Sequence, residues 1–345
     1  MAAARVTTLP ASWYTDPAVL RREQQQIFHG SWQYVARADQ VAAPRSYVAA
    51  RVGDVPVAIV RDERGELRGF VNVCRHRGHE VVSGAGTKAT LQCPYHAWTY
   101  GLDGRLRSAP RADREPGFSV DGIALVPVAV DTWGPFVFAN PERRAAPLAE
   151  ALGELPERFG LDLGGLRFQR RVEWTVEANW KVVVENFLEC YHCAVAHPGF
   201  SAVVDVSPEA YRLRVDGPVL SQHAVLRGGG SEVDGEFHLI WPNTTINVFP
   251  GKPNLSIGPV LPAGPGRTSR FLDYWFAEDA DEEWIRELHA FDDQVGREDE
   301  SLVESVQRGL ASGLVDRGIV LPESEQLIVA FDALVERALA ADAFP

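Results

Sequence analysis

The sequence lacks any long uninterrupted hydrophobic run. Its most apolar stretch, residues 122–139, is broken by Pro127, Asp131 and Pro135, whereas a membrane-spanning helix needs about 20 apolar residues. Residues 1–30 also lack the basic start and apolar segment of a secretory signal peptide. These absences predict a protein that neither spans a membrane nor is exported.

Cysteine and positive charge are scarce as well. The four cysteines are Cys74, Cys93, Cys190 and Cys193, and all stand in clusters typical of metal ligands. This placement favours a reducing compartment over a disulfide framework, so we expect a cytoplasmic protein. The formal net charge of −13 argues against nucleic acid as a partner.

The 345 residues, of which 46% are hydrophobic, provide enough material for two domains. Residues 1–31 read as an N-terminal segment with one helix, over 17–29, that packs on the second domain. Residues 32–140 contain short β-rich segments broken by Gly, Pro and Asp, which predicts an antiparallel all-β domain. Residues 141–345 predict an α+β domain with helices packed on an antiparallel sheet. We expect its strands near 167–177, 211–226, 236–249, 254–261 and 269–277, and its long helices over 281–312 and 323–340.

Two cysteine–histidine hooks lie in the β-rich domain. They are Cys74/His76 and Cys93/His96, separated by residues 77–92. Two such hooks facing each other can hold a two-iron cluster, with both cysteines on one iron and both histidines on the other. Zinc is the alternative, but zinc sites usually present a cysteine pair and then a histidine pair with wider spacing.

A second group of polar residues follows in the α+β domain. A helix predicted over residues 179–193 carries Glu185, Glu189 and His192 on one face, because they are spaced four and three apart. His197 comes five residues after His192, so on a regular helix its side chain would point to a different face. Sharing one metal therefore requires a widened turn or a helix end, and the Pro-Gly pair after His197 predicts such an end.

The helix predicted over 281–312 supplies a carboxylate. Its apolar stripe advances in steps of three and four through Trp284, Leu288, Phe291, Val295, Leu302, Val306 and Leu310. Asp299 falls on this stripe, where a carboxylate is costly unless it is paired or bound to a metal. Its neighbours Glu298 and Glu300 are expected to point into solvent. His192, His197 and Asp299 together match the 2-His-1-carboxylate triad of non-haem Fe(II) oxygenases.

Other readings of this region stay open. A histidine pair and a buried aspartate also occur as ordinary structural features. Cys190 and Cys193, with the two histidines, also match a zinc cluster or a CxxC redox pair. A redox pair of that kind has a thioredoxin-like βαβ context, which is missing here, and zinc would leave Glu189 and Asp299 without a role.

The electron source is predicted to be a separate protein. Residues 84–89 match a dinucleotide-binding GxGxxA by letters, but they do not connect a strand to a helix, so we interpret them as a loop between the hooks. Residues 68–111 carry seven basic and two acidic residues, a net charge of +5. Such a basic rim suits an acidic electron carrier, although an ordinary solvated face explains it equally well.

The chain as a whole resembles the Rieske non-haem iron oxygenases, the α-subunits of the aromatic-ring-hydroxylating oxygenases. The resemblance covers Asn72–Gly78 with Cys93–Trp98, Asn179–Lys181 with Glu185-Asn186, the His192/His197 pair, and Glu298-Asp299 with Glu304–Leu310. The branch with choline/glycine-betaine-type monooxygenases is the most similar. The resemblance implies a Rieske [2Fe-2S] cluster on Cys74, His76, Cys93 and His96, a mononuclear Fe(II) on His192, His197 and Asp299, and a helix-grip, START-like catalytic domain.

The resemblance also implies a homotrimer, in which electrons pass from the cluster of one subunit to the mononuclear iron of its neighbour. The family bridges the two centres with a carboxylate three residues before the first iron histidine. That position is Glu189 here, where Asp is common. Glu189 would contact His192 in its own subunit and His96 across the interface. The chain length favours a trimer of α-subunits alone, and the presence of a β-subunit stays open.

We therefore predict the terminal oxygenase component of a Rieske oxygenase system. It would use O₂ and electrons from an NAD(P)H-dependent reductase, directly or through a ferredoxin, to hydroxylate or oxidatively demethylate a small aromatic compound or alkylated amine. The alternative is a Rieske-type electron-transfer protein without oxygenase activity, which needs only residues 32–138. Six aromatic residues on the predicted strands are candidates to line the substrate pocket, although ordinary core packing explains most of them equally well: Phe237, Trp241, Phe249, Tyr274, Trp275 and Phe276. The pattern does not distinguish mono-oxygenation, dioxygenation and demethylation.

Overall fold

The computed structural model describes residues 6–340. Contacts between residues divide the chain into two compact units. One unit comprises Phe28–Leu148, and the other combines the N-terminal residues up to Ile27 with the chain from Ala149 onward. Within the described residues, every helix is too short or too polar to cross a membrane.

The Phe28–Leu148 unit is built of β-strands, as predicted. Its larger sheet has the strand order β1-β10-β9-β4-β3-β2-β5, and its smaller sheet has the order β6-β7-β8. The strands are β1 Gln33–Arg37, β2 Ser46–Val52, β3 Val55–Arg61, β4 Leu67–Val71, β5 Ala85–Thr87, β6 Leu91–Gln92, β7 Thr99–Tyr100, β8 Leu106–Ser108, β9 Pro127–Trp133 and β10 Phe136–Asn140. The segment 84–89, interpreted as a loop, therefore contains the short strand β5, which pairs with β2.

Strand β3 connects the two hydrophobic cores of this unit. Val57 and Ile59 belong to one core, whereas Ala58 and Val60 belong to a second core that contains Cys74. Successive side chains on a strand point to opposite faces of the sheet, so one continuous apolar run supplies both cores. The cysteine of the first hook is thereby anchored in the hydrophobic interior.

The other unit contains an antiparallel sheet with the order β11-β17-β16-β15-β14-β13-β12. Its strands are β11 Leu166–Val176, β12 Arg212–Asp216, β13 Val219–Ala224, β14 Gly235–Ile240, β15 Thr244–Val248, β16 Asn254–Gly264 and β17 Arg267–Ala277. The segments 211–226 and 236–249, each predicted as one strand, are hairpins. In the first, Gly217 adopts a φ of 55°, a left-handed conformation that favours a tight turn between paired strands.

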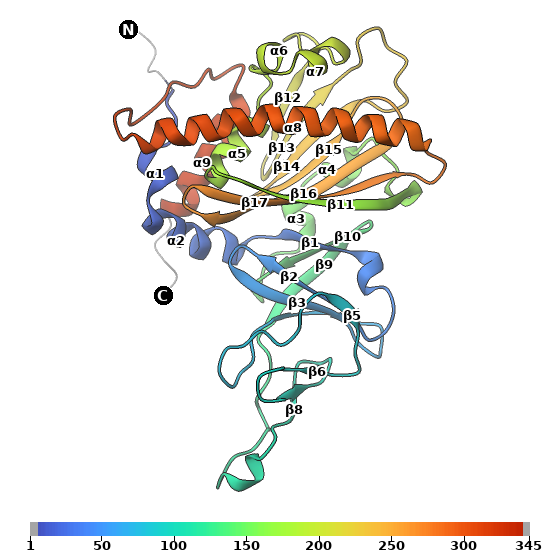
Figure 1. Ribbon diagram of the computed structural model, residues 1–345, viewed down its shortest axis with the longest axis vertical. Helices are drawn as coiled ribbons and strands as arrows, with labels where there is room; N and C mark the ends of the chain where they lie inside the picture. The colour runs from blue at the N-terminus through green and yellow to red at the C-terminus, as the bar shows by residue number, and fades with distance from the viewer. Residues whose placement is uncertain (1–5, 341–345) are drawn as a thin grey trace. The chain divides into compact units, whose positions relative to one another are not determined.

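Helices complete this unit. The α-helices of the described chain are α1 Ala11–Thr15, α2 Pro17–Gln26, α3 Leu148–Leu152, α4 Leu155–Arg158, α5 Trp180–Phe187, α6 Cys193–Ala196, α7 Pro198–Val203, α8 Glu282–Ala311 and α9 Gln326–Ala340. Helix α8, orange in Figure 1, lies across the sheet. Trp284 and Leu288 of α8 pack against Leu272 of β17. This arrangement is the predicted α+β fold, an antiparallel sheet with helices packed against it.

The start of α8 agrees with the prediction, but its buried face does not follow the predicted stripe. The Asp281 side chain caps the helix by accepting hydrogen bonds from the amides of Glu283 and Trp284. Leu302 and Val306, predicted as buried, are 38% and 50% exposed. Val303 and Gln307 are buried in their place, because a period of 3.6 residues drifts away from a repeat of seven.

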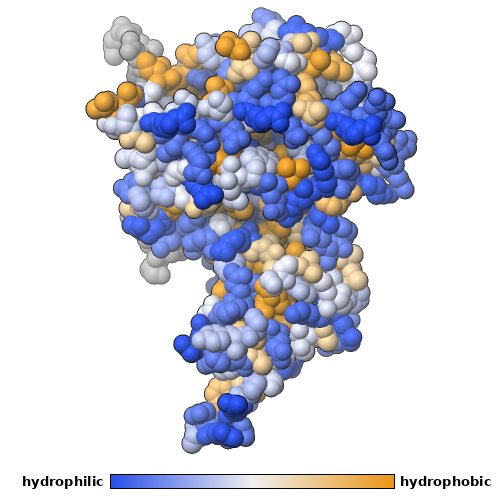
Figure 2. All heavy atoms as spheres, viewed as in Figure 1, coloured by the Kyte–Doolittle hydropathy of each residue, from blue (hydrophilic) through white to orange (hydrophobic). Residues whose placement is uncertain are grey.

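Hydrophilic side chains predominate over α8 in Figure 2. The segment 278–304 carries twelve acidic residues and two arginines, a net charge of −10. Its first turn exposes Glu282 and Glu283, where negative charge stabilises a helix N-terminus.

The helix predicted over 179–193 is correct only in its first half. Helix α5 ends at Phe187, and the chain then forms a turn before α6 begins at Cys193. The Glu189 carboxylate holds this turn by accepting hydrogen bonds from the amides of Tyr191 and His192. A side chain that accepts hydrogen bonds from nearby backbone amides competes with helical hydrogen bonding. Glu185 and Glu189 therefore do not share a helix face.

Candidate functional site

The two cysteine–histidine hooks fold into loops with the same backbone hydrogen bonds. The amide of Gly78 donates to the carbonyl of Cys74 at 3.1 Å, and the amide of Ala97 donates to the carbonyl of Cys93 at 3.0 Å. The donor residues have left-handed conformations, with φ values of 77° and 57°. Glycine adopts this conformation freely, whereas alanine does so at a cost that the surrounding structure must offset. The two hooks are thus matched in structure although their sequences differ.

The loops sort their four side chains by exposure. Cys74 and Cys93 are buried and are not in a disulfide. His76 and His96 are exposed, and their ring centroids lie 4.7 Å apart. The ring of Trp98 stacks on His76 at 4.9 Å. Two buried thiols beside two exposed imidazoles fit the Rieske donor set, in which cysteines hold one iron and histidines the other.

The spacing of the hooks argues against zinc. Within residues 6–340, the group of three or more side chains whose ligand atoms all lie within 4.8 Å of one another is His192, His197 and Asp299. The hooks do not form such a group, whereas one zinc ion requires all its ligands at about 2.0–2.3 Å. Their wider spacing suits a cluster better than a single ion.

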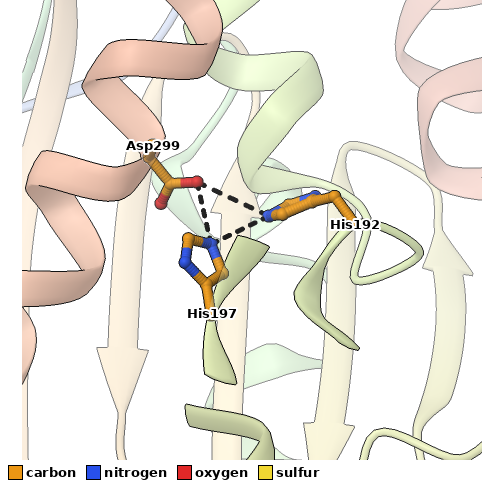
Figure 3. A group of neighbouring side chains, drawn as sticks. All are labelled: His192, His197 and Asp299. Carbon is orange, nitrogen blue, oxygen red and sulfur yellow. Dashed lines mark hydrogen bonds and ion pairs between the residues drawn. The ribbon is translucent and has the colours of Figure 1, made fainter. Parts of the chain in front are cut away.

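The second site brings together three residues from two segments of the chain, as Figure 3 shows. His192 directly precedes α6, His197 lies between α6 and α7, and Asp299 lies on α8. The helix end predicted at His197 is confirmed. Nε2 of His197 lies 3.0 Å from Nε2 of His192 and 3.0 Å from Oδ1 of Asp299. Two imidazoles and a carboxylate facing one point are the donors that non-haem iron requires.

Each histidine is oriented by a further carboxylate. Nδ1 of His192 hydrogen-bonds the Glu189 carboxylate, and Nδ1 of His197 hydrogen-bonds the Glu298 carboxylate at 2.8 Å. Such outer carboxylates keep the opposite ring nitrogen turned toward a metal. The prediction that Glu298 points into solvent is therefore wrong, and Glu300 also lines the cavity beside the site. Helix position alone could not reveal this, since the partner lies on a distant segment.

The electrostatics of the triad favour a bound cation. Burial lowers the pKa of His192, but its hydrogen bonds to the Asp299 and Glu189 carboxylates outweigh this effect and raise the pKa to about 9. Burial raises the pKa of Asp299, but its bonds to His192 and His197 lower the pKa to about 2. The ionised carboxylates thus attract positive charge to the imidazoles, and a metal ion competes with protons for the same nitrogens.

Glu185, predicted to face the site, belongs to a different network. It accepts a hydrogen bond at 2.7 Å from the hydroxyl of Tyr14 on α1. Lys181 and Glu23 form a fully buried ion pair at 2.5 Å. This pair is part of the same network, because the positive charge of Lys181 opposes the rise in the pKa of Glu185 that burial causes. The end of α5 at Phe187 separates this network from Glu189.

Cys190 and Cys193 form a disulfide. The expectation of a chain without disulfides is therefore wrong for this pair, because the turn between α5 and α6 brings their Cα atoms to 4.9 Å. Two sulfurs bonded to each other do not hold zinc, so this pairing also disfavours the zinc reading.

A cavity of about 390 Å³ opens beside the triad. Its acidic lining residues are Glu189, Asp292, Asp293, Asp299 and Glu300, its basic ones are Arg270 and Arg297, and its aromatic ones are Trp174, Phe187, Phe200, Tyr211, Phe237, Phe249 and Tyr274. The cavity therefore combines apolar walls with an excess of negative charge.

Half of the aromatic residues expected near the substrate line this cavity, namely Phe237, Phe249 and Tyr274. Trp275 points to the other face of β17, since it alternates with Tyr274, and packs on Phe168 at 5.7 Å. Phe276 packs on Trp284, and Trp241 packs on Phe331. Sequence analysis missed the cavity-lining residues Trp174, Arg270 and Asp292. The only signal in the sequence was their position on one face of a predicted strand or helix.

Comparisons with known proteins identify the family of the chain. Residues 31–129 match the Rieske [2Fe-2S] domain, and residues 163–231 and 230–341 match the catalytic domain of the ring hydroxylating alpha subunit. The carnitine monooxygenase oxygenase subunit of Acinetobacter pittii is 35% identical over 92% of this chain and 90% of its own. The chloroplastic choline monooxygenase of Arabidopsis thaliana is 35% identical over 91% of this chain and 79% of its own.

A solved structure leads to the same conclusion. The quaternary ammonium Rieske monooxygenase CntA, in complex with L-carnitine, superposes with a TM-score of 0.86 at 32% identity, over 97% of this chain and 96% of its own. A Rieske protein limited to electron transfer would leave the matched catalytic domain unexplained. The chain belongs to the family of ring-hydroxylating oxygenase α-subunits, and it is a Rieske non-haem iron oxygenase.

Proposed function

We propose that this oxygenase acts on a small alkylated ammonium compound at an iron held by His192, His197 and Asp299. The composition of the cavity carries the proposal, because seven aromatic residues line it together with Asp292, Asp293 and Glu300, which belong neither to the triad nor to its outer carboxylates. Aromatic rings and carboxylates together bind quaternary ammonium groups through cation–π and Coulomb attraction. Relatives named for carnitine and choline support the same substrate class.

The chain's own residues have distinct roles in this proposal. His192, His197 and Asp299 hold the iron, which when bound supplies the binding and reduction of O₂. Glu298 keeps His197 in position through their hydrogen bond at 2.8 Å. The apolar walls of the cavity exclude water from the substrate, which protects the reaction from side products.

We assign Cys74, His76, Cys93 and His96 to the [2Fe-2S] cluster within a domain of residues 32–140. Residues 1–31 and 141–345 are assigned to the catalytic domain. A separate NAD(P)H-dependent reductase, alone or with a ferredoxin, supplies the electrons in this proposal. A cytoplasmic location is part of this proposal, because two of the four cysteines serve as cluster ligands and only Cys190 and Cys193 form a disulfide.

Assembly as a homotrimer would give Glu189 its role. Its carboxylate contacts Nδ1 of His192 and is 11% exposed at the edge of the cavity. His96 is exposed in its own unit, so a second copy can reach it. Inter-subunit electron transfer is described for the similar CntA. Glu189→Gln, which keeps an oxygen acceptor for Nδ1 of His192 and removes the charge, is expected to retain both iron centres and to lose turnover, as measured by metal content and O₂ uptake.

The iron site is tested by Asp299→Ala, with Glu287→Ala on the exposed side of α8 as the control. Purified wild-type protein should contain three irons per chain and acid-labile sulfide, by the cofactor contents of the two sites. Asp299→Ala should lose the mononuclear iron and turnover, while the EPR signal of the reduced cluster persists. Full activity in Asp299→Ala would overturn the assignment.

The substrate class is tested by coupled O₂ uptake with a panel of trimethylammonium compounds and aromatic acids. Uptake that accompanies product formation from the ammonium compounds supports the proposal. Product formed from aromatic acids alone would refute it.

A further inference from the structure

Arg270 is a positive charge inside the catalytic cavity. It lies on β17, on the same face as the cavity-lining Leu272 and Tyr274. Its Nη2 donates a hydrogen bond to Oγ1 of Thr245 at 3.1 Å. Its guanidinium lies 5.2 Å from the ring centroid of Trp174 on the paired strand β11.

The guanidinium of Arg270 is incompletely paired. In the part of the chain that the structure describes, its buried Nε has no hydrogen-bond partner. The neighbouring Arg171 shows the difference, because its Nε and Nη2 donate to the two carboxylate oxygens of Asp273, each at 2.7 Å. A guanidinium has five N–H donors in a fixed fork that matches a carboxylate.

The acidic residues that act on Arg270 are engaged elsewhere. Asp292 and Asp299 exert the largest attraction on it. Asp292 accepts a hydrogen bond from the hydroxyl of Tyr274, and Asp299 is committed to the two histidines of the triad. Neither carboxylate provides the two-oxygen partner that Asp273 gives Arg171.

We infer that Arg270 binds a carboxylate of the substrate, and therefore that the substrate is a zwitterion with an ammonium group and a carboxylate. This inference rests on the proposed function and narrows its substrate class. The acidic and aromatic walls receive the cationic end, and Arg270 receives the anionic end. A buried donor left unpaired by an analogue without the carboxylate discriminates strongly against that analogue.

The inference predicts a preference that one pair of ligands can measure. L-carnitine and its primary carboxamide differ in the negative charge and keep nearly the same shape. Their dissociation constants would be measured by calorimetry on the iron-loaded enzyme. Wild type should bind the carboxylate about 10- to 100-fold more tightly than the amide, as expected for a charge-assisted hydrogen-bonded pair. A wild-type ratio near one would overturn the inference.

Variants at two positions of β17 show whether Arg270 causes the preference for the carboxylate ligand. Arg270→Gln should reduce the ratio to about one by weakening only the carboxylate, and Arg270→Lys, which keeps the charge but loses the fork, should give an intermediate ratio. Arg267→Gln removes an arginine from the same strand, where it pairs with Glu177 at the surface, and should keep the wild-type ratio. Equal weakening of both ligands in the Arg270 variants would show that Arg270 only balances the acids, which overturns the inference.

Failure of the proposed function has a different signature. If aromatic acids bind and react in place of ammonium compounds, benzoate and benzamide replace the ligand pair. A preference for benzoate that Arg270→Gln abolishes would support carboxylate binding at Arg270 while refuting the ammonium substrate. If benzoate and benzamide bind equally, both the inference and the proposed function are refuted.

Discussion

Nδ1 of His197 donates a hydrogen bond to the Glu298 carboxylate at 2.8 Å, and this contact turns Nε2 of the same ring toward Asp299. Glu298 and Asp299 are adjacent on α8, yet they act on opposite nitrogens of one imidazole. One turn of helix thereby supplies both a candidate ligand and the group that orients another.

Removal of this orienting carboxylate should weaken iron binding. Glu298→Ala leaves His197 free to rotate, so we expect iron affinity to fall about 10- to 100-fold, as is typical for such outer partners. Iron retained after dialysis against a graded chelator measures the effect. Glu287→Ala, an exposed glutamate of the same helix, serves as the control. Unchanged retention in Glu298→Ala would mean that the contact does not orient the ring.

The hydroxyl of Tyr100 should tune the cluster. It accepts a hydrogen bond from the Arg75 amide at 2.9 Å, which leaves its own proton for Sγ of Cys74 at 3.2 Å. Hydrogen bonds to cluster sulfurs raise the reduction potential. Tyr100→Phe should therefore lower the potential by about 60 mV, the one-electron equivalent of a charge-assisted hydrogen bond. Spectroelectrochemical titration measures it.

Tyr47 offers a matched control in the same core, because its hydroxyl bonds the Ser83 carbonyl at 3.3 Å and not a cysteine. Tyr47→Phe should leave the potential unchanged. Equal shifts in the two variants would attribute the effect to packing.

The disulfide between Cys190 and Cys193 should stabilise the fold without holding metal. Replacing both cysteines by serine should keep the mononuclear iron, because no sulfur belongs to the triad. Closing so short a loop contributes about 2 kcal/mol to the free energy of unfolding. Denaturant unfolding with and without reductant measures this contribution, which reductant should remove from wild type only. Loss of metal from the serine variant would indicate that Cys190 and Cys193 are metal ligands, as in a zinc site.

Asp332 on α9 should make stability depend on pH. It is 7% exposed, and burial followed by the charge of Glu336 raises its pKa to about 7, well above the value of about 3.9 in unfolded chains. The folded state therefore holds the proton more tightly, and stability falls as pH rises from the unfolded pKa through the folded one.

Asp332→Asn removes this titration. We expect it to raise Tm by a few degrees at pH 8 and by less at pH 5, as measured by calorimetry at both values. Asp279→Asn, at an exposed position, should not change Tm at either pH. The same shift at both pH values for Asp332→Asn would contradict a raised pKa.

Local patterns predicted much of this structure. The all-β unit, the helix α8 and the helix end at His197 follow from side-chain periodicity and turn residues, which act over a few neighbours. Errors arose where a side chain competed with the local pattern. Glu189 ended the predicted helix by binding backbone amides, and the drift of α8 moved Val303 into the place expected for Leu302.

By itself, the sequence determined which donors are available, because the hooks and the His192/His197 pair are short motifs whose spacing restricts how they fold. Only the tertiary structure decided their surroundings. It joined Asp299 to the histidines across a hundred residues of chain, and it placed Arg270 in the cavity without a matching carboxylate. Contacts between distant segments depend on how the sheet and α8 pack, and this packing cannot be read from neighbouring residues alone.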